Sequence, residues 1–261
     1  MITGYRAALA VEALKARRSR VPVMTFVAAT GASGVAALFM FILSDPDRAH
    51  RWGLLHQKAT LSGLTADWTG LLTFLAQIVA VADMMLFSFV LTWLFGREAA
   101  DGTMRYLLAL PVPRTTIVLA KFTVAAVWAA ATNLWLIVLV LATGKALALP
   151  GEDAAVVSHG LAVAATAAGL MLLATAPVAL VASAGRGYLA PLAAALGALV
   201  VAQVGSGLGW AEVIPWAVPA VAAGLVPDTS LGPSSLLIVT LTSTGGVLGT
   251  LCWWRSGAAG N

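Results

Sequence analysis

Long runs of apolar residues, separated by short polar stretches, make up most of the sequence. A helix that crosses a hydrocarbon core of ~30 Å needs about 20 apolar residues. Runs of that length predict six membrane-spanning helices, at about residues 21–43, 69–95, 116–143, 154–183, 189–208 and 234–254. The first run is longer than the apolar core of a signal peptide, about 7–15 residues, so we interpret it as an uncleaved span. The pattern predicts an all-α membrane protein, with residues 1–261 forming a single transmembrane domain.

The composition excludes several classes of protein. Hydrophobic residues make up 60% of the chain and charged residues only 10%, against about 25% charged residues in soluble domains. The hydrophobicity is also too high for a disordered chain. The single cysteine, Cys252, excludes an intrachain disulfide and a cysteine-based metal site. Because the basic residues flank apolar runs rather than forming one polar face, nucleic acid is not an expected partner.

The distribution of Lys and Arg predicts the orientation of the spans. Six spans place both termini on one side of the membrane. If that side is the cytoplasm, the inner segments hold eleven basic residues and the outer segments hold four. An excess of Lys and Arg in cytoplasmic segments is the general rule. We therefore expect both termini to be cytoplasmic and the protein to lie in the plasma (cytoplasmic) membrane.

Two segments outside the spans have patterns of their own. Residues 1–20 combine good helix formers with five basic residues, which is typical of an interfacial helix on an anionic inner leaflet. The alternative is a simple positively charged flank. Residues 209–226 are apolar but contain Glu212, Pro215 and Pro219, so they are too broken to span. We expect a broken re-entrant hairpin on the outer side, between spans five and six, and the alternative is a partly ordered outer loop.

The inner loop at residues 96–114 has the pattern of a short amphipathic helix that stops at Pro111. A spacing of three and four residues gathers on one face the apolar side chains of Met104, Leu107 and Leu108. A spacing of four gathers on another face the charged side chains of Arg97, Asp101 and Arg105. An apolar ridge beside charges suits the docking of a soluble partner. The alternative is an ordinary interfacial loop whose ridge faces lipid.

The same loop is similar to that of a known family. The string FGREAADGTMRYLLALPVPRTTIVLAKF resembles the signature loop of ABC transporter type-2 permeases, in the branch typified by bacitracin and lantibiotic export or immunity. The matching positions are Gly96, Arg97, Glu98, Gly102, Thr103, Leu107, Leu108, Leu110, Pro111, Arg114, Ala120, Lys121 and Phe122. The pair Asp67-Trp68 and the segment 215–219 are also similar to the family.

The resemblance implies a permease subunit that exports a drug, peptide or amphipathic substrate with the help of a separate ABC ATPase. It implies that the ATPase docks on the loop through Arg97, Glu98, Asp101, Gly102, Thr103, Arg105, Leu107 and Leu108. ATP and Mg²⁺ would then bind to the ATPase. This chain would bind no cofactor, because it lacks a G-x-x-x-x-G-K-[ST] phosphate loop. A second permease subunit, identical or related, would complete the pathway.

Polar residues within or beside the apolar runs are candidates for the transport pathway. Asp83 lies in the middle of the second run, where an ionisable group costs a few kcal/mol to insert. The other pathway candidates are Gln77, Gln203 and Glu212, and Gln203 is a candidate partner for Asp83. The alternative role for Asp83 is a structural hydrogen bond to a neighbouring helix.

Three other functions compete with export. An antimicrobial immunity or sensing module would have the same architecture, and the sequence does not separate the two. A secondary carrier would show internal repeats, and we find no clear one. An intramembrane serine protease would use Gly31-Ala32-Ser33-Gly34 with His159, but such small residues pack helix interfaces more simply. The three histidines have no metal-ligand spacing, so we expect neither catalytic nor metal-binding residues.

Overall fold

The computed structural model describes residues 2–51, 53, 64–108, 112–185 and 187–256, and this part of the chain contains helices and loops but no strand. The helices are α1 (Ile2–Arg18), α2 (Val21–Ser44), α3 (Pro46–Arg51), α4 (Trp68–Ala100), α5 (Met104–Leu108), α6 (Arg114–Ala146), α7 (Ala154–Ala174), α8 (Pro177–Ala184), α9 (Leu189–Gly207), the 3₁₀ helix η1 (Ala211–Val213), α10 (Val218–Ala222) and α11 (Pro233–Ser256).

Six helical segments in the described chain are long and apolar enough to cross a membrane. Five of them are the single helices α2, α4, α6, α9 and α11, and the sixth combines α7 with α8. Each predicted apolar run lies on one of these segments, which confirms the predicted all-α protein with six candidate spans. α4 and α6 are longer than the predicted spans: α4 continues to Ala100, and α6 extends from Arg114 to Ala146.

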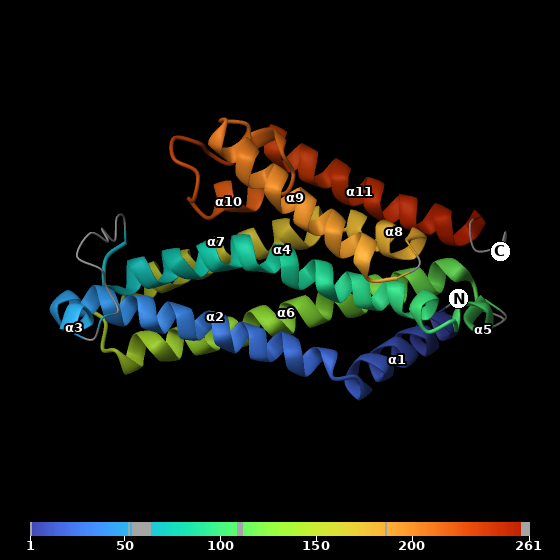
Figure 1. Cartoon of the computed structure of the whole chain (residues 1–261), viewed down its shortest axis with the longest axis horizontal. Helices are drawn as coiled ribbons and strands as arrows, with labels where there is room; N and C mark the ends of the chain where they lie inside the picture. The colour runs from blue at the N-terminus through green and yellow to red at the C-terminus, as the bar shows by residue number, and fades with distance from the viewer. Residues whose placement is uncertain (1, 52, 54–63, 109–111, 186, 257–261) are drawn as a thin grey trace.

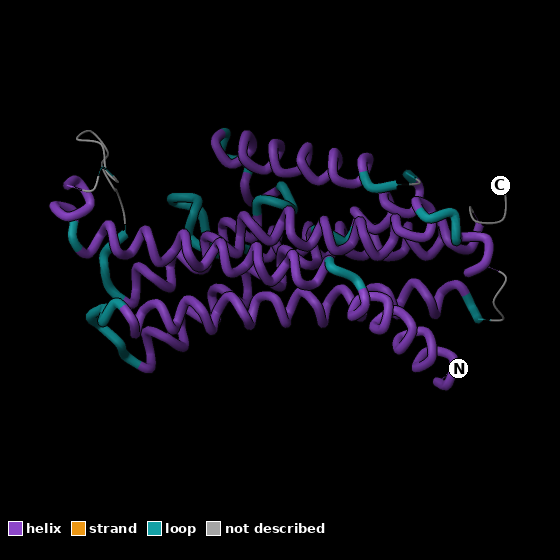
Figure 2. Tube along the Cα trace, turned by 60° about the horizontal axis from the view of Figure 1, so that its bottom comes forward, coloured by secondary structure: helices purple, strands orange, loops and turns teal. Residues whose placement is uncertain are grey.

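The spans run side by side along the long axis of the molecule, with α4 at the centre (Figure 1). α4 packs against α6, α7, α8 and α9, while α2 packs on α6 and α11 packs on α8. Figure 2 shows the same lengthwise arrangement from a second direction. Accordingly, 61% of the apolar stretch of α4 is buried inside the protein, against 28% for α2 and 22% for α9. The outer helices leave large apolar side chains exposed, as expected for a chain surrounded by lipid.

The fourth span is broken at Pro177. α7 ends at Ala174 and α8 begins at Pro177, because proline lacks the N–H donor and its ring clashes with the preceding turn. The indole N–H of Trp216 donates to the Ala174 carbonyl over 2.9 Å and so satisfies a carbonyl at the break. α11 approaches the break so closely that a Cβ on Gly246 would lie 2.5 Å from the backbone nitrogen of Pro177. Glycine is the residue that fits at position 246 without a shift of the backbone.

The helix predicted within residues 1–20 is present as α1 and packs against α6. Glu12 and Ala16 are buried at this contact. The hydroxyl oxygens of Tyr5 on α1 and Thr123 on α6 lie 2.7 Å apart. α1 is therefore attached to the spans along one face, and its position on a membrane surface stays a prediction.

The segment 209–226 folds back against the bundle. It contains η1 and α10, and α10 packs against α7. Its buried side chains are Ala211, Ala217, Val218, Pro219, Val221 and Ala223. Burial against protein is what an interrupted backbone needs inside a membrane, but the depth of this segment in the bilayer stays a prediction.

α1, α5 and the last turn of α11 lie at the same end of the bundle, which we call the α5 end (Figure 1). The guanidinium group of Arg114, at the start of α6, donates to the carbonyls of Trp254 and Arg255, each over 3.2 Å. These bonds join the first turn of the third span to the last turn of the sixth. An even number of spans therefore brings both ends of the described chain to the α5 end.

Candidate functional site

The described part of the connection between α4 and α6 contains a tight turn and the short helix α5. α4 ends in a Schellman motif, in which the Thr103 N–H donates to the Glu98 carbonyl (2.9 Å) and the Gly102 N–H to the Ala99 carbonyl (3.3 Å). Gly102 has a φ of +66°, a conformation that residues with a Cβ rarely adopt. The chain consequently turns sharply out of α4 and exposes Asp101, Gly102 and Thr103.

Arg97 and Asp101, which the spacing places on one helix face, form an ion pair, with Nε of Arg97 3.3 Å from Oδ2 of Asp101. The Arg97 guanidinium also lies over the ring of Trp93, 5.1 Å from its centroid. An exposed pair of this kind contributes at most about 1 kcal/mol to stability. Its main effect is to place opposite charges on the surface of the turn. The side chains of Arg105 and Leu108, also predicted for docking, lie outside the described part of the structure.

Two of the three residues of the predicted apolar ridge on α5 face the spans. Met104 and Leu107 are half-buried and pack against the apolar cluster that includes Phe95 and Ile117. Among the described side chains of α5, that of Tyr106 is 68% exposed. Met104 and Leu107 thus contact the spans, and the docking role expected of the ridge stays a prediction. Helical spacing groups the apolar residues on one face but does not tell whether that face meets a partner or the protein's own core.

A cluster of four charged side chains, three of them buried and one partly exposed, lies behind the turn. Lys121 of α6 has no exposed surface, and its Nζ donates to Oε1 of Glu98 (2.7 Å) and to Oε2 of Glu12 (3.2 Å). It also donates to the carbonyl of Leu94. Lys15 donates to Oε1 of Glu12 (2.7 Å) and to Oε1 of Glu98 (3.0 Å). We call Glu12, Lys15, Glu98 and Lys121 the charge cluster.

The charge cluster ties three helices together at the α5 end. Its two carboxylates and two ammonium groups carry no net charge, and they come from α1, α4 and α6. Burial lowers the pKa of Lys15, but the carboxylates of Glu98 and Glu12 outweigh burial and raise it above its ordinary value. Glu98 was predicted as a docking residue, yet it is 3% exposed. It therefore contacts the spans and α1 rather than an outer surface.

The second polar site of the spans is formed by Asp83 and Asn133. Asp83 of α4 is buried, and its Oδ2 accepts a hydrogen bond of 2.9 Å from Nδ2 of Asn133 on α6. Asn133 was missed in the sequence because an uncharged amide inside an apolar run carries little signal. Gln203, the candidate partner, is exposed on α9, and Gln77 is half-buried on α4.

The remaining predicted residues do not form a reactive site. Glu212 is exposed on η1. The hydroxyl of Ser33 donates to the Thr30 carbonyl over 2.8 Å, within its own helix. His159 is exposed near the start of α7. The structure therefore does not pair Ser33 with His159 as a protease would require.

The fold and these two polar sites define a multi-pass membrane protein with an internal charge cluster at one end. The sequence model of a family described as "ABC-2 family transporter protein" matches residues 8–202. This match covers more than half of the 261 residues, so the chain belongs to the ABC-2 family of transporter proteins. Membership indicates an ABC transporter permease and implies a partner ATPase. No curated protein and no solved structure gave a significant match.

Proposed function

We propose that this chain is the permease subunit of an ATP-driven exporter and that its ATPase docks at the α5 end. The observation that carries the proposal is the two-sided connection between α4 and α6. Its outer side exposes Asp101, Gly102, Thr103 and Tyr106. Its inner side packs Met104 and Leu107 onto the spans.

The connection is suited to transmit a movement of the docked ATPase to the membrane-spanning helices. The outer residues follow α4 directly, and the charge cluster behind them holds α4 to α6 and to α1. A displacement of α5 therefore acts on two spans and on α1 together, because buried charge pairs resist separation. ATP and Mg²⁺ act on the ATPase in this proposal, and the chain contributes motion and a pathway.

The proposed orientation follows the positive-inside rule. Exposed basic residues lie where α1 joins the first span, at Arg17, Arg18 and Arg20, and in the last turn of α11, at Arg255. This bias supports a cytoplasmic α5 end in the plasma membrane, with α1 at the inner surface and the 209–226 hairpin re-entering from outside.

The further identity of the exporter rests on the resemblance in the loop. That resemblance supports the branch of bacitracin and lantibiotic export, with a drug, peptide or amphipathic substrate and a role in antibiotic resistance. A second permease subunit, identical or related, completes the pathway. In the closely related immunity function, the same machine extracts an antimicrobial from the membrane.

A double substitution at the outer side of the connection tests the docking role. The change Asp101→Lys with Tyr106→Asp reverses one charge and removes the exposed aromatic ring without touching the charge cluster. We expect the tagged variant to insert normally but to lose at least about 10-fold of the ATP hydrolysis that copurifies with the wild-type protein from its native membranes, since anchor residues at interfaces are worth about 2 kcal/mol or more.

The matched control makes similar changes at exposed positions outside the connection between α4 and α6. Glu152→Lys with Trp210→Asp alters an exposed acid and an exposed aromatic residue, and we expect it to retain the copurifying ATPase. If the α5-end variant retained normal, coupled ATP hydrolysis and export, the docking proposal would be wrong.

A further inference from the structure

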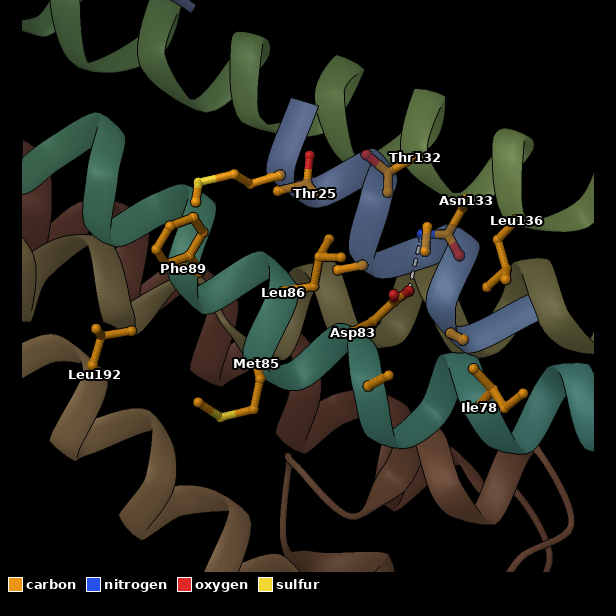
Figure 3. Close-up of a pocket in the computed structure, with 15 residues that line it drawn as sticks. Thr25, Ile78, Asp83, Met85, Leu86, Phe89, Thr132, Asn133, Leu136 and Leu192 are labelled. Carbon is orange, nitrogen blue, oxygen red and sulfur yellow. Dashed lines mark hydrogen bonds between the residues drawn. The ribbon is translucent and has the colours of Figure 1, made fainter. Parts of the chain in front are cut away.

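A pocket of about 480 Å³ opens between α2, α4, α6 and α9 (Figure 3). This volume lies in the range of small-molecule sites, about 300–1,000 Å³. Most of the lining side chains are apolar, for example Met24, Leu86 and Phe89. Among the residues that line it, Asp83 is the single ionisable one. The pocket therefore combines an apolar wall with one acid.

The lining residues leave Asp83 without a positive partner. Its hydrogen-bond donor is the amide of Asn133, which is neutral. The two hydroxyl groups in the lining donate elsewhere: Thr25 donates to the Pro22 carbonyl (2.7 Å) and Thr132 to the Trp128 carbonyl (3.0 Å). A carboxylate in an apolar setting without a counter-charge is costly, because burial of a charge needs a partner.

Asn133 presents a second acceptor beside the carboxyl group. Its Nδ2 donates both to Asp83 and to the Ala129 carbonyl (3.2 Å), which fixes the orientation of the amide. Its Oδ1 is buried and has no hydrogen-bond partner among the described residues. In Figure 3 the two side chains point toward each other beside the pocket. Asp83 and Asn133 thus present oxygen acceptors to the pocket, and both N–H groups of the Asn133 amide are already used in hydrogen bonds.

We propose that this pocket binds an amphiphilic cation. The charged N–H group of the ligand meets the carboxylate of Asp83, with the carbonyl oxygen of Asn133 beside it, and the apolar body lies along α2 and α4. Such a ligand supplies the positive charge and the donors that the lining lacks, and it matches the apolar wall. Binding of the cation does not depend on the proposed function. Only the further statement that the cation is the transported substrate rests on it.

Binding by the purified chain tests the proposal without any ATPase. The chain is placed in nanodiscs of zwitterionic lipid and titrated with dodecylammonium, 1-dodecanol and dodecanoate, three probes with the same tail and different head groups. Binding is followed by the shift of the unfolding midpoint, since a ligand that binds the folded state raises it. Empty nanodiscs give the partitioning of each probe into lipid.

We expect saturable binding of dodecylammonium in preference to the neutral and anionic probes. In Asp83→Asn, the affinity for dodecylammonium should fall roughly 10- to 100-fold, the worth of a hydrogen bond to a charged group, while that for 1-dodecanol stays the same. The matched control Asp228→Asn makes the same change at an exposed position and should bind as the wild type does. Ala28→Phe, which fills the pocket from α2, should weaken binding of both probes.

Equal binding of dodecylammonium and 1-dodecanol by the wild type would show a slot for lipid tails and overturn the proposal. The same conclusion would follow if Asp83→Asn, with a normal unfolding midpoint, bound dodecylammonium unchanged. If Asp83→Asn failed to fold, two other measurements would test the proposal. These are the preference of the wild type for dodecylammonium over 1-dodecanol and the weaker binding of both probes by Ala28→Phe. None of these outcomes bears on ATPase docking, which the substitutions at Asp101 and Tyr106 test separately.

Discussion

The spans contain two buried polar sites, and they differ in how their charges are compensated. In the charge cluster at the α5 end, Glu98 and Lys121 face each other at 2.7 Å, with a second acid and a second base beside them. Midway along α4, Asp83 meets one neutral amide and faces a pocket. Both sites lie between α4 and α6, so the same two helices carry a closed polar site and an open one.

This difference in charge compensation indicates that one site has a structural role and the other a role in binding. A buried charge that is fully paired resists change, because removal of one partner leaves the other uncompensated. A buried charge that lacks a counter-ion leaves binding energy available for a ligand. The comparison assigns the charge cluster to holding the α5 end together and Asp83 to contact with something that enters the pocket.

The largest expected effect is that of breaking the charge cluster at its centre. Lys121→Met keeps the length of the side chain but leaves two buried carboxylates with only Lys15 as a partner. We expect the free energy of unfolding to fall by about 3–5 kcal/mol. Denaturant unfolding of the purified chain in nanodiscs measures this loss.

Two further variants show whether the loss comes from uncompensated charge. Lys121→Met combined with Glu98→Gln leaves the neutral pair of Glu12 and Lys15 and should recover part of the lost stability. Lys145→Met removes a lysine from an exposed pair with Glu152 and should cost no more than about 1 kcal/mol. Equal effects of Lys121→Met and Lys145→Met would contradict the assignment of the cluster to structure.

A smaller effect is expected at the half-exposed member of the cluster. The pKa of Lys15 in the folded protein is raised above its ordinary value of 10.5. Its contribution to stability is therefore fully present below that value and is lost as the pH rises through the raised pKa. Melting curves of the wild type and of Lys15→Met, recorded from neutral to strongly alkaline pH, should converge at the alkaline end. A constant difference across that range would refute the assignment.

The smallest effect is expected at the open site. Asp83→Asn keeps the shape of the side chain and an oxygen that accepts from Asn133, and it removes the cost of a buried charge. We expect the free energy of unfolding to stay within about 1 kcal/mol of the wild-type value or to rise. A loss comparable to that of Lys121→Met, measured in parallel, would mean that the two sites do not differ as described.

The spans could be predicted because the hydropathy of a span is a property of consecutive residues. Six apolar runs were sufficient to identify the six helical segments, and the break before Pro177 follows from the chemistry of proline. The ion pair between Arg97 and Asp101 was also predictable, since residues four apart share a helix face. In each case the determining residues lie within a few positions of one another.

The polar sites could not be predicted because their members are distant in sequence. Glu12 and Lys121 are separated by 109 positions, and Asp83 and Asn133 by 50. Lys121 inside an apolar run was the one local sign that a buried acid had to lie nearby. The orientation of α5 depends likewise on the packing of Leu107 against other spans, which periodicity alone does not contain.

The charge cluster also has a consequence for how the protein is made. Glu12 leaves the ribosome 109 residues before Lys121, the cation that it meets in the finished fold. Until the third span has been synthesised and inserted, α1 lacks this counter-charge and cannot adopt its final position. Docking of α1 therefore follows the insertion of the third span, halfway through the six spans.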